Sequence, residues 1–141
     1  GTLFPYTTLF RSVSKTDTLA ESMVATGFPY KMSDHWHRSM DLFKLFYYKT
    51  HGVRRDGSAA LDLAYVASGR FDGFWEYDLH PWDVAAGLLL VEEAGGITTD
   101  FSDNRSSIFH RQVLATNERI HQDMLKVIQS IPVTDEHPQD T

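Results

Sequence analysis

Strand-like and helical segments alternate along most of this 141-residue chain. Short runs rich in β-branched or aromatic residues occupy 23–26, 53–55, 71–77, 97–99 and 113–116. Apolar residues recur at helical spacing over 33–49, 58–68, 81–94 and the residues that follow Asn117. Strands separated by helices of about ten residues or more predict a mainly parallel sheet that helices flank. The sequence therefore predicts an α/β fold.

Residues at the helix ends support these four helices. Ser33 or Asp34 can cap the first helix, Gly69 suits a left-handed turn after the second, and Pro81 suits the first turn of the third. The spacing of the apolar residues then predicts which face of each helix points inward. The expected inward residues are Trp36, Met40, Phe43 and Tyr47; Leu61, Ala64, Tyr65 and Ser68; Trp82, Ala85, Ala86, Leu89 and Glu93; and, in the last helix, Ile120, Met124, Val127 and Ile128.

Two terminal segments do not share this pattern. Residues 1–12 have no helix cap, no clean period and no charge pattern, and they lack the features of a signal peptide. We interpret them as a non-native segment. Residues 134–141 form a polar tail, so residues 13–133 make up the one expected domain.

Composition excludes several classes of protein. With no cysteine, the chain has neither a disulfide framework, nor a thiolate zinc site, nor a cysteine nucleophile. Nineteen acidic residues against thirteen basic ones give a net charge of −6, which argues against a nucleic-acid partner. The longest strongly apolar run, 84–91, is too short to cross a bilayer. We expect a soluble, cytoplasmic domain with no membrane partner.

One segment, residues 75–96, carries polar side chains where chemistry is expected. Asp83 falls in the first turn of its helix, after a strand, where open α/β sheets place their sites. A carboxylate there can bind a hard cation such as Mg²⁺, or can simply interact with the helix dipole. Trp82 can be a core anchor, and Glu76 a solvated residue at the end of a strand. Periodicity alone leaves these alternatives open.

Longer stretches of sequence resemble a known family. From about Val13 to Pro132, the chain resembles the C-terminal half of a bacterial-type inositol monophosphatase. Residues 57–70, Gly-Ser-Ala-Ala-Leu-Asp-Leu-Ala-Tyr-Val-Ala-Ser-Gly-Arg, are similar to the helix after that family's substrate-side loop. Residues 82–87, Trp-Asp-Val-Ala-Ala-Gly, continued to Gly95-Gly96, are similar to its second signature motif, and 113–117 to a late strand and turn. The resemblance implies the C-terminal αβα layer of the family's fold.

The resemblance also implies a function. Members of the family hydrolyse phosphate monoesters with Mg²⁺, are inhibited by lithium and are usually homodimers. By this resemblance Asp83 is a metal ligand, and Glu76 accepts a hydrogen bond from a hydroxyl of the inositol ring. Ala59, reached through the loop of Gly57 and Ser58, contacts the same ring through its backbone. The implied substrate is a small phosphorylated polyol.

Two parts of the family's pattern are absent from this sequence. The first signature, Asp-Pro-x-Asp-Gly-Thr, and the upstream helical Glu supply most metal ligands in the family, so we assign no catalytic residue to this chain. We expect a truncated C-terminal portion that is inactive by itself. Histidinol-phosphate phosphatase and 3′,5′-bisphosphate nucleotidase stay open as alternatives, although Glu76 favours a polyol. A non-catalytic half-domain that serves binding or assembly is the alternative from another class.

Overall fold

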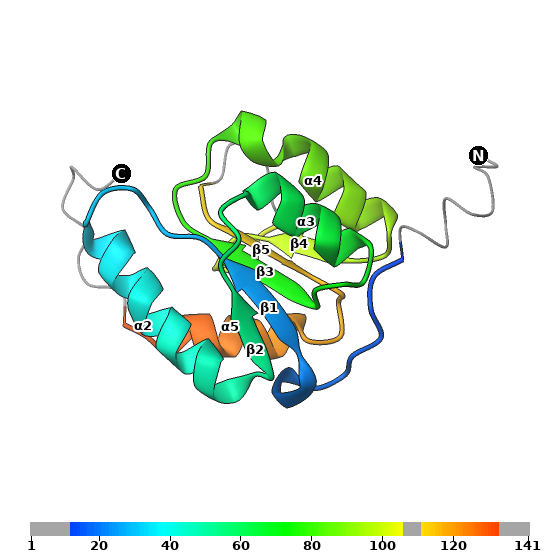
Figure 1. Cartoon of the computed structure of the whole chain (residues 1–141), viewed down its shortest axis with the longest axis horizontal. Helices are drawn as coiled ribbons and strands as arrows, with labels where there is room; N and C mark the ends of the chain where they lie inside the picture. The colour runs from blue at the N-terminus through cyan, green and yellow to red at the C-terminus, as the bar shows by residue number, and fades with distance from the viewer. Residues whose placement is uncertain (1–11, 106–110, 133–141) are drawn as a thin grey trace.

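The computed structural model describes residues 12–105 and 111–132. Most of the predicted terminal segments, 1–12 and 134–141, therefore lie outside the described residues. Within the described residues the chain folds into five strands, four α-helices and a short 3-10 turn (Figure 1). In chain order these are η1 (Leu19–Glu21), β1 (Met23–Thr26), α2 (Asp34–Lys49), β2 (Gly52–Arg54), α3 (Ala59–Ala67), β3 (Gly73–Glu76), α4 (Pro81–Glu93), β4 (Ile97–Thr99), β5 (Val113–Thr116) and α5 (His121–Gln129).

The strands form one mixed sheet in the order β2-β1-β3-β5-β4. β1 pairs in parallel with both β2 and β3. β5 pairs antiparallel with β3 and with β4, so it runs against the direction that the other four strands share. The predicted α/β fold with a mainly parallel sheet is thus confirmed. Because β1, β2 and β3 are adjacent and parallel, their carboxyl ends lie at the same edge of the sheet.

Helices cover both faces of the sheet, α2 and α5 on one side and α3 and α4 on the other (Figure 1). Successive residues of a strand point to opposite faces, and the strands follow this rule. Val24, Trp75 and Leu114 join the core beneath α2 and α5. Their neighbours Ala25 and Phe74 join the core beneath α3 and α4. The three central strands, β1, β3 and β5, therefore contribute to both cores.

The predicted inward face is correct for α5 and wrong for the other three helices. The four residues predicted for the last helix are buried, Ile120 at the N-cap of α5 and the other three within it, together with His121 and Leu125. In α2 the buried residues are Ser39, Leu42 and Phe46, and in α3 they are Asp62, Leu63, Val66 and Ala67. In α4 they include Val84, Leu88 and Val91. The predicted faces contain residues that are largely exposed: Tyr47 (68%), Leu61 (43%), Trp82 (75%) and Leu89 (56%).

For α3 and α4 this error has a physical reason. α3 and α4 carry apolar residues around most of their circumference, so spacing alone does not determine which side meets the sheet.

The helix boundaries were easier to predict than the helix faces. Ser58 caps α3 by accepting a hydrogen bond from the Leu61 N–H at 3.2 Å, Gly69 follows it at φ +81°, and α4 begins at Pro81.

Residues 13–17 are joined to the sheet by hydrogen bonds around Asp72, the residue before β3. One carboxylate oxygen of Asp72 accepts from the Met23 N–H at 2.7 Å, and the other accepts from the Ser14 hydroxyl. Asn117 donates its amide to the Thr16 carbonyl at 2.9 Å. The segment before η1 is therefore part of the packed unit. No helix among the described residues is long and apolar enough to cross a membrane.

Candidate functional site

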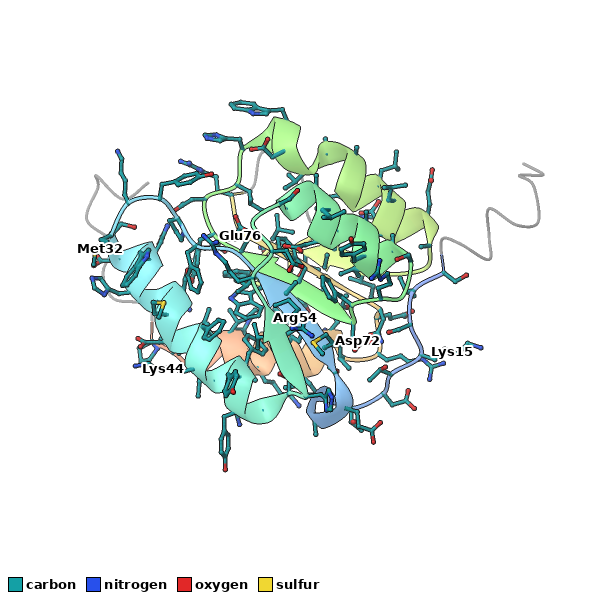
Figure 2. The ribbon with its side chains drawn as sticks, in the orientation of Figure 1. Lys15, Met32, Lys44, Arg54, Asp72 and Glu76 are labelled. Atoms are coloured by element: carbon teal, nitrogen blue, oxygen red, sulfur yellow. The ribbon has the colours of Figure 1, made fainter. Side chains whose placement is uncertain are left out.

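Acidic side chains gather at the edge where the three parallel strands end. β1 is followed by Gly27, β2 by a loop of residues 55–58, and β3 by residues 77–80. The ends of β1 and β3 lie side by side: Thr26 pairs with Trp75, and the Thr26 hydroxyl donates to the Trp75 carbonyl at 2.6 Å. Figure 2 shows Glu76 at this end of β3 and Asp72 at the opposite end. The site predicted from the sequence thus has a definite place in the fold.

Glu76 is the last residue of β3, and its carboxylate lies against the backbone of Gly27. A Cβ atom at position 27 would lie 2.1 Å from Glu76 Oε1, so a side chain there would displace the carboxylate. Burial raises the pKa of Glu76 to about 8, and the negative charge of Asp62 adds to this effect. Arg55 acts in the opposite direction. Glu76 is therefore a half-buried acid in a negative environment rather than a solvated strand end.

Asp62 is a member of the cluster that the sequence analysis did not identify. It lies in the first turn of α3, it is 1% exposed, and its Oδ1 has no hydrogen-bond partner among the described residues. Burial raises its pKa to about 7, and the nearby charge of Asp56 and a side-chain hydrogen bond with it act in the same direction. The signal in the sequence was a lone charged residue inside the apolar run 59–67.

The predicted substrate-binding residues Ser58 and Ala59 lie at the beginning of α3, beside these acids. Gly57 precedes them at φ +89°, a left-handed conformation that L-residues with side chains rarely adopt. The Ser58 hydroxyl is committed to the helix cap, while Ala59 is the first helical residue. The first N–H groups of a helix have no partner within it, so this end can donate to a ligand.

Asp83, the predicted metal ligand, lies in the first turn of α4 and is exposed. Its charge contributes to the raised pKa of Glu76, which places both acids in one electrostatic cluster. Trp82 is not the core anchor that the sequence suggested. The residue is 75% exposed, and its ring stacks on the His80 ring at a centroid distance of 4.6 Å.

A second histidine links α2 to this edge of the sheet. His35 Nδ1 lies 3.0 and 3.1 Å from the two carboxylate oxygens of Asp78, and its ring stacks on Tyr77 at 4.6 Å. Asp78 has φ +61°, so the chain turns sharply between β3 and α4. Neither residue was singled out from the sequence, because their contact joins segments more than forty residues apart.

These residues do not form a metal site by themselves. No group of three or more His, Cys, Asp or Glu side chains among the described residues is arranged to hold a metal ion. Mg²⁺ needs near-octahedral oxygen coordination, and Asp83 offers only one carboxylate. The described residues therefore supply at most part of a metal-binding site.

The fold and the cluster together define a class: an α/β protein with a cluster of acidic side chains at the carboxyl ends of parallel strands. Comparison with known sequences then identifies the family. The inositol monophosphatase family profile matches residues 7–132, and the chain belongs to that family. This confirms the resemblance found in the sequence.

Individual relatives agree with this assignment. The chain is 47% identical over 116 residues to "Phosphatase IMPL1, chloroplastic" of Arabidopsis thaliana, covering 82% of this chain and 31% of that protein. It is 41% identical over 120 residues to "Inositol-1-monophosphatase" of Synechocystis sp., covering 85% of this chain and 42% of the relative. "Nus factor SuhB" of Pseudomonas aeruginosa is 40% identical over 119 residues, covering 83% of this chain and 44% of the relative.

A solved structure shows the same arrangement. The inositol monophosphatase from Anabaena superposes with a TM-score of 0.79 at 42% identity, over 86% of this chain and 48% of that one. The chain thus spans less than half the length of each of these four proteins.

Proposed function

We propose that this chain supplies the polyol-binding side of a Mg²⁺-dependent phosphatase site that hydrolyses inositol monophosphate or a related phosphorylated polyol. The observation that carries the proposal is the position of Glu76, a half-buried carboxyl group that lies against Gly27 and close enough to Asp62 of α3 to feel its charge. Family membership and the printed names of the Synechocystis and Anabaena relatives support the reaction class.

Each site residue has a role in this proposal. Glu76 hydrogen-bonds a ring hydroxyl of the polyol. Ala59 contacts the ring through its backbone at the beginning of α3, and Ser58 holds that end of the helix in shape. Asp83 provides one carboxylate ligand to Mg²⁺, and the other ligands come from outside the described residues.

We further propose that the catalytic residues lie in the part of the relatives that this chain does not match, so that the isolated chain is inactive. Two observations support this. The described residues do not complete a metal site, and the outer faces of α3 and α4 expose Leu61, Trp82 and Leu89. Large exposed apolar patches indicate a surface that another segment covers. In this proposal residues 13–133 are the C-terminal domain of a longer, dimeric enzyme.

The test is to read the source DNA upstream of the Ser12 codon in frame and to express the longer product. We expect an Asp-Pro-x-Asp-Gly-Thr motif and an upstream helical Glu in that product. We also expect Mg²⁺-dependent phosphate release from inositol 1-phosphate, which Asp83→Asn abolishes. The 141-residue chain is assayed in parallel and should show no turnover. Turnover by this chain that Asp83→Asn abolishes would contradict the need for a second half.

The longer product and the 141-residue chain also distinguish two alternatives. The rates at which the longer product hydrolyses inositol 1-phosphate, histidinol phosphate and a 3′,5′-bisphosphate nucleotide compare the substrates of the superfamily. Equal rates would show that Glu76 confers no selectivity. Light scattering of the 141-residue chain tests the non-catalytic half-domain. A stable monomer at high concentration would favour that alternative, whereas association through the exposed faces of α3 and α4 would favour the longer enzyme.

A further inference from the structure

The turn between β3 and α4 joins two acids of the proposed site, and a histidine of α2 contacts this turn. Glu76 ends β3, Asp83 lies in the first turn of α4, and residues 77–80 connect them. The Asp83 N–H donates to the His80 carbonyl at 3.0 Å, so the turn leads directly into the helix. The conformation of residues 77–80 therefore sets where α4 begins relative to the end of β3.

Within this turn, Asp78 adopts a backbone conformation that is costly for a residue with a side chain. Its φ is +61°, in the left-handed region that glycine adopts without strain. Aspartate tolerates this region better than most residues do, but the region still costs an L-residue more than the extended or right-handed conformations. Such a conformation persists where surrounding contacts hold it. The shape of the turn therefore depends on the contacts that Asp78 makes.

His35 supplies such a contact. Its Nδ1 lies 3.0 and 3.1 Å from the two carboxylate oxygens of Asp78, and because a carboxylate only accepts hydrogen bonds, the imidazole N–H is the donor. A hydrogen bond to a charged acceptor is stronger than one between neutral groups. The same imidazole stacks on Tyr77 at a centroid distance of 4.6 Å, and Tyr77 in turn meets Phe101 at 4.8 Å. One ring thus contacts two consecutive residues of the turn.

Asp78 also lies where the chain crosses from one face of the sheet to the other. Tyr77 is buried in the core beneath α2 and α5, whereas Leu79 is buried in the core beneath α3 and α4. The backbone hydrogen bond from the Leu79 N–H to the Arg111 carbonyl is long, at 3.4 Å. The side-chain contact of Asp78 with His35 is shorter than this backbone contact, and it acts at the crossing itself.

His35 is held in turn by a packed helix. Its carbonyl accepts a hydrogen bond from the Ser39 hydroxyl at 2.7 Å, and Ser39 is buried. Further along α2, Phe46 packs on Trp75 of β3 at a centroid distance of 4.3 Å. A side chain on a packed helix positions its partner more precisely than one on a loop does. α2 therefore gives His35 a fixed place from which to hold the turn.

We propose that His35 is a positioning residue: its hydrogen bond to Asp78 holds the turn of residues 77–80 in its left-handed conformation, and so fixes the spacing between Glu76 and Asp83. The restraint of the turn needs no enzyme activity. Its consequence for catalysis rests on the function proposed above, in which Glu76 binds the polyol and Asp83 is a ligand to Mg²⁺.

The first test is a double-mutant cycle in the 141-residue chain. His35→Phe keeps an aromatic ring beside Tyr77 but removes the hydrogen bond, and Asp78→Gly removes the carboxylate while tolerating φ +61°. Hydrogen exchange of the Leu79 amide, which donates to Arg111, is measured by NMR. His35→Phe should accelerate this exchange at least about tenfold, as expected when a local restraint is lost. In the Asp78→Gly background it should change the rate by less than about twofold, because the partner is absent.

A control and a second measurement complete this test. His37→Phe is the matched control, because His37 is an exposed histidine two residues further along α2, and it should leave the Leu79 exchange rate within about twofold of the parent's. The ¹⁵N shifts of the His35 ring in the parent should show a proton on Nδ1. A neutral ring protonated only on Nε2 would overturn the proposal, whether or not the variants fold. Equal acceleration by His35→Phe with and without the Asp78 carboxylate would also overturn it.

The second test uses the longer phosphatase and two substrates. Inositol 1-phosphate meets both Glu76 and the metal side of the site, whereas 4-nitrophenyl phosphate has no polyol ring for Glu76 to bind. His35→Phe should raise the KM for inositol 1-phosphate at least about fivefold and change that for 4-nitrophenyl phosphate by less than about twofold. Equal changes for both substrates would refute the role in spacing. A parent without activity on either substrate, beside an intact exchange effect, would refute the proposed function and leave the restraint of the turn standing.

Discussion

Replacing Glu76 by Gln tests whether burial raises the pKa of the Glu76 carboxyl group. Gln has nearly the same shape and can keep the contact with Gly27, but it does not ionise. The folded-state pKa of Glu76 is raised from 4.5 to about 8, mainly by burial. An acid with a raised folded-state pKa favours the folded state most at low pH, and this contribution is lost as pH rises through the folded-state value.

The structure gives the size of the effect. A gap of about 3.5 pKa units corresponds to at most about 5 kcal/mol of folding free energy. Because Glu76 keeps some contact with solvent, we expect about 2–5 kcal/mol to be observed. The free energy of unfolding of Glu76→Gln, measured relative to that of the parent, should therefore rise by this amount between pH 5 and pH 9.

Urea unfolding at pH 5, 7 and 9 measures this difference directly. Glu93→Gln is the matched control, because Glu93 is an exposed glutamate at the end of α4. It should change stability by no more than about 0.5 kcal/mol at any pH. A parent and a Glu76→Gln variant whose stabilities differ equally at pH 5 and pH 9 would show that Glu76 titrates normally, and the reasoning about its burial would be refuted.

Three further predictions concern other parts of the molecule. Asp83→Asn should abolish Mg²⁺-dependent turnover of the longer protein, yet change the urea stability of this chain by less than about 0.5 kcal/mol, because Asp83 is exposed. Burial lowers the pKa of His121 to about 4 from 6.5, so stability should fall by about 3 kcal/mol as pH drops from 6.5 to 4, and His121→Gln should remove this dependence in urea titrations. Gly96→Ala would place a Cβ atom 2.4 Å from the Thr116 carbonyl oxygen, so thermal unfolding should show a loss of about 2 kcal/mol or more.

Strand and helix boundaries could be predicted from the sequence because local chemistry sets them. Ser58 accepts a backbone hydrogen bond, Gly69 adopts a left-handed turn and Pro81 needs no donor N–H, and each of these acts within a few residues. Helix faces are different. α5 has one apolar face and was predicted correctly, whereas α4 is apolar on both sides, and only tertiary packing decides that Val84 and not Ala85 meets the sheet.

The candidate site also contains residues that could be identified from the sequence and residues that could not. Asp83 could be considered because it begins a helix that follows a strand, a position where α/β sheets place their sites, and the family resemblance singled out both Asp83 and Glu76. Asp62 could not, because its raised pKa depends on its burial beneath neighbouring elements and on the nearby charge of Asp56. The contact of His35 with Asp78 joins α2 to the loop after β3, and no local pattern encodes a contact of that range.

The proposed metal ligand and a group of exposed apolar residues lie on the same side of α4. The exposed side of α4 includes Trp82, Asp83, Ala85, Ala86 and Leu89, so the predicted metal ligand lies at one end of an uncovered apolar surface. In the function proposed above, a segment of the longer protein that covered this surface would come within reach of Asp83, where Mg²⁺ requires further oxygen ligands. We therefore expect one and the same part of the longer protein to bury α4 and to complete the metal site. Adding that part should raise the unfolding temperature of the domain and confer Mg²⁺ binding together, and a segment that conferred one without the other would contradict this expectation.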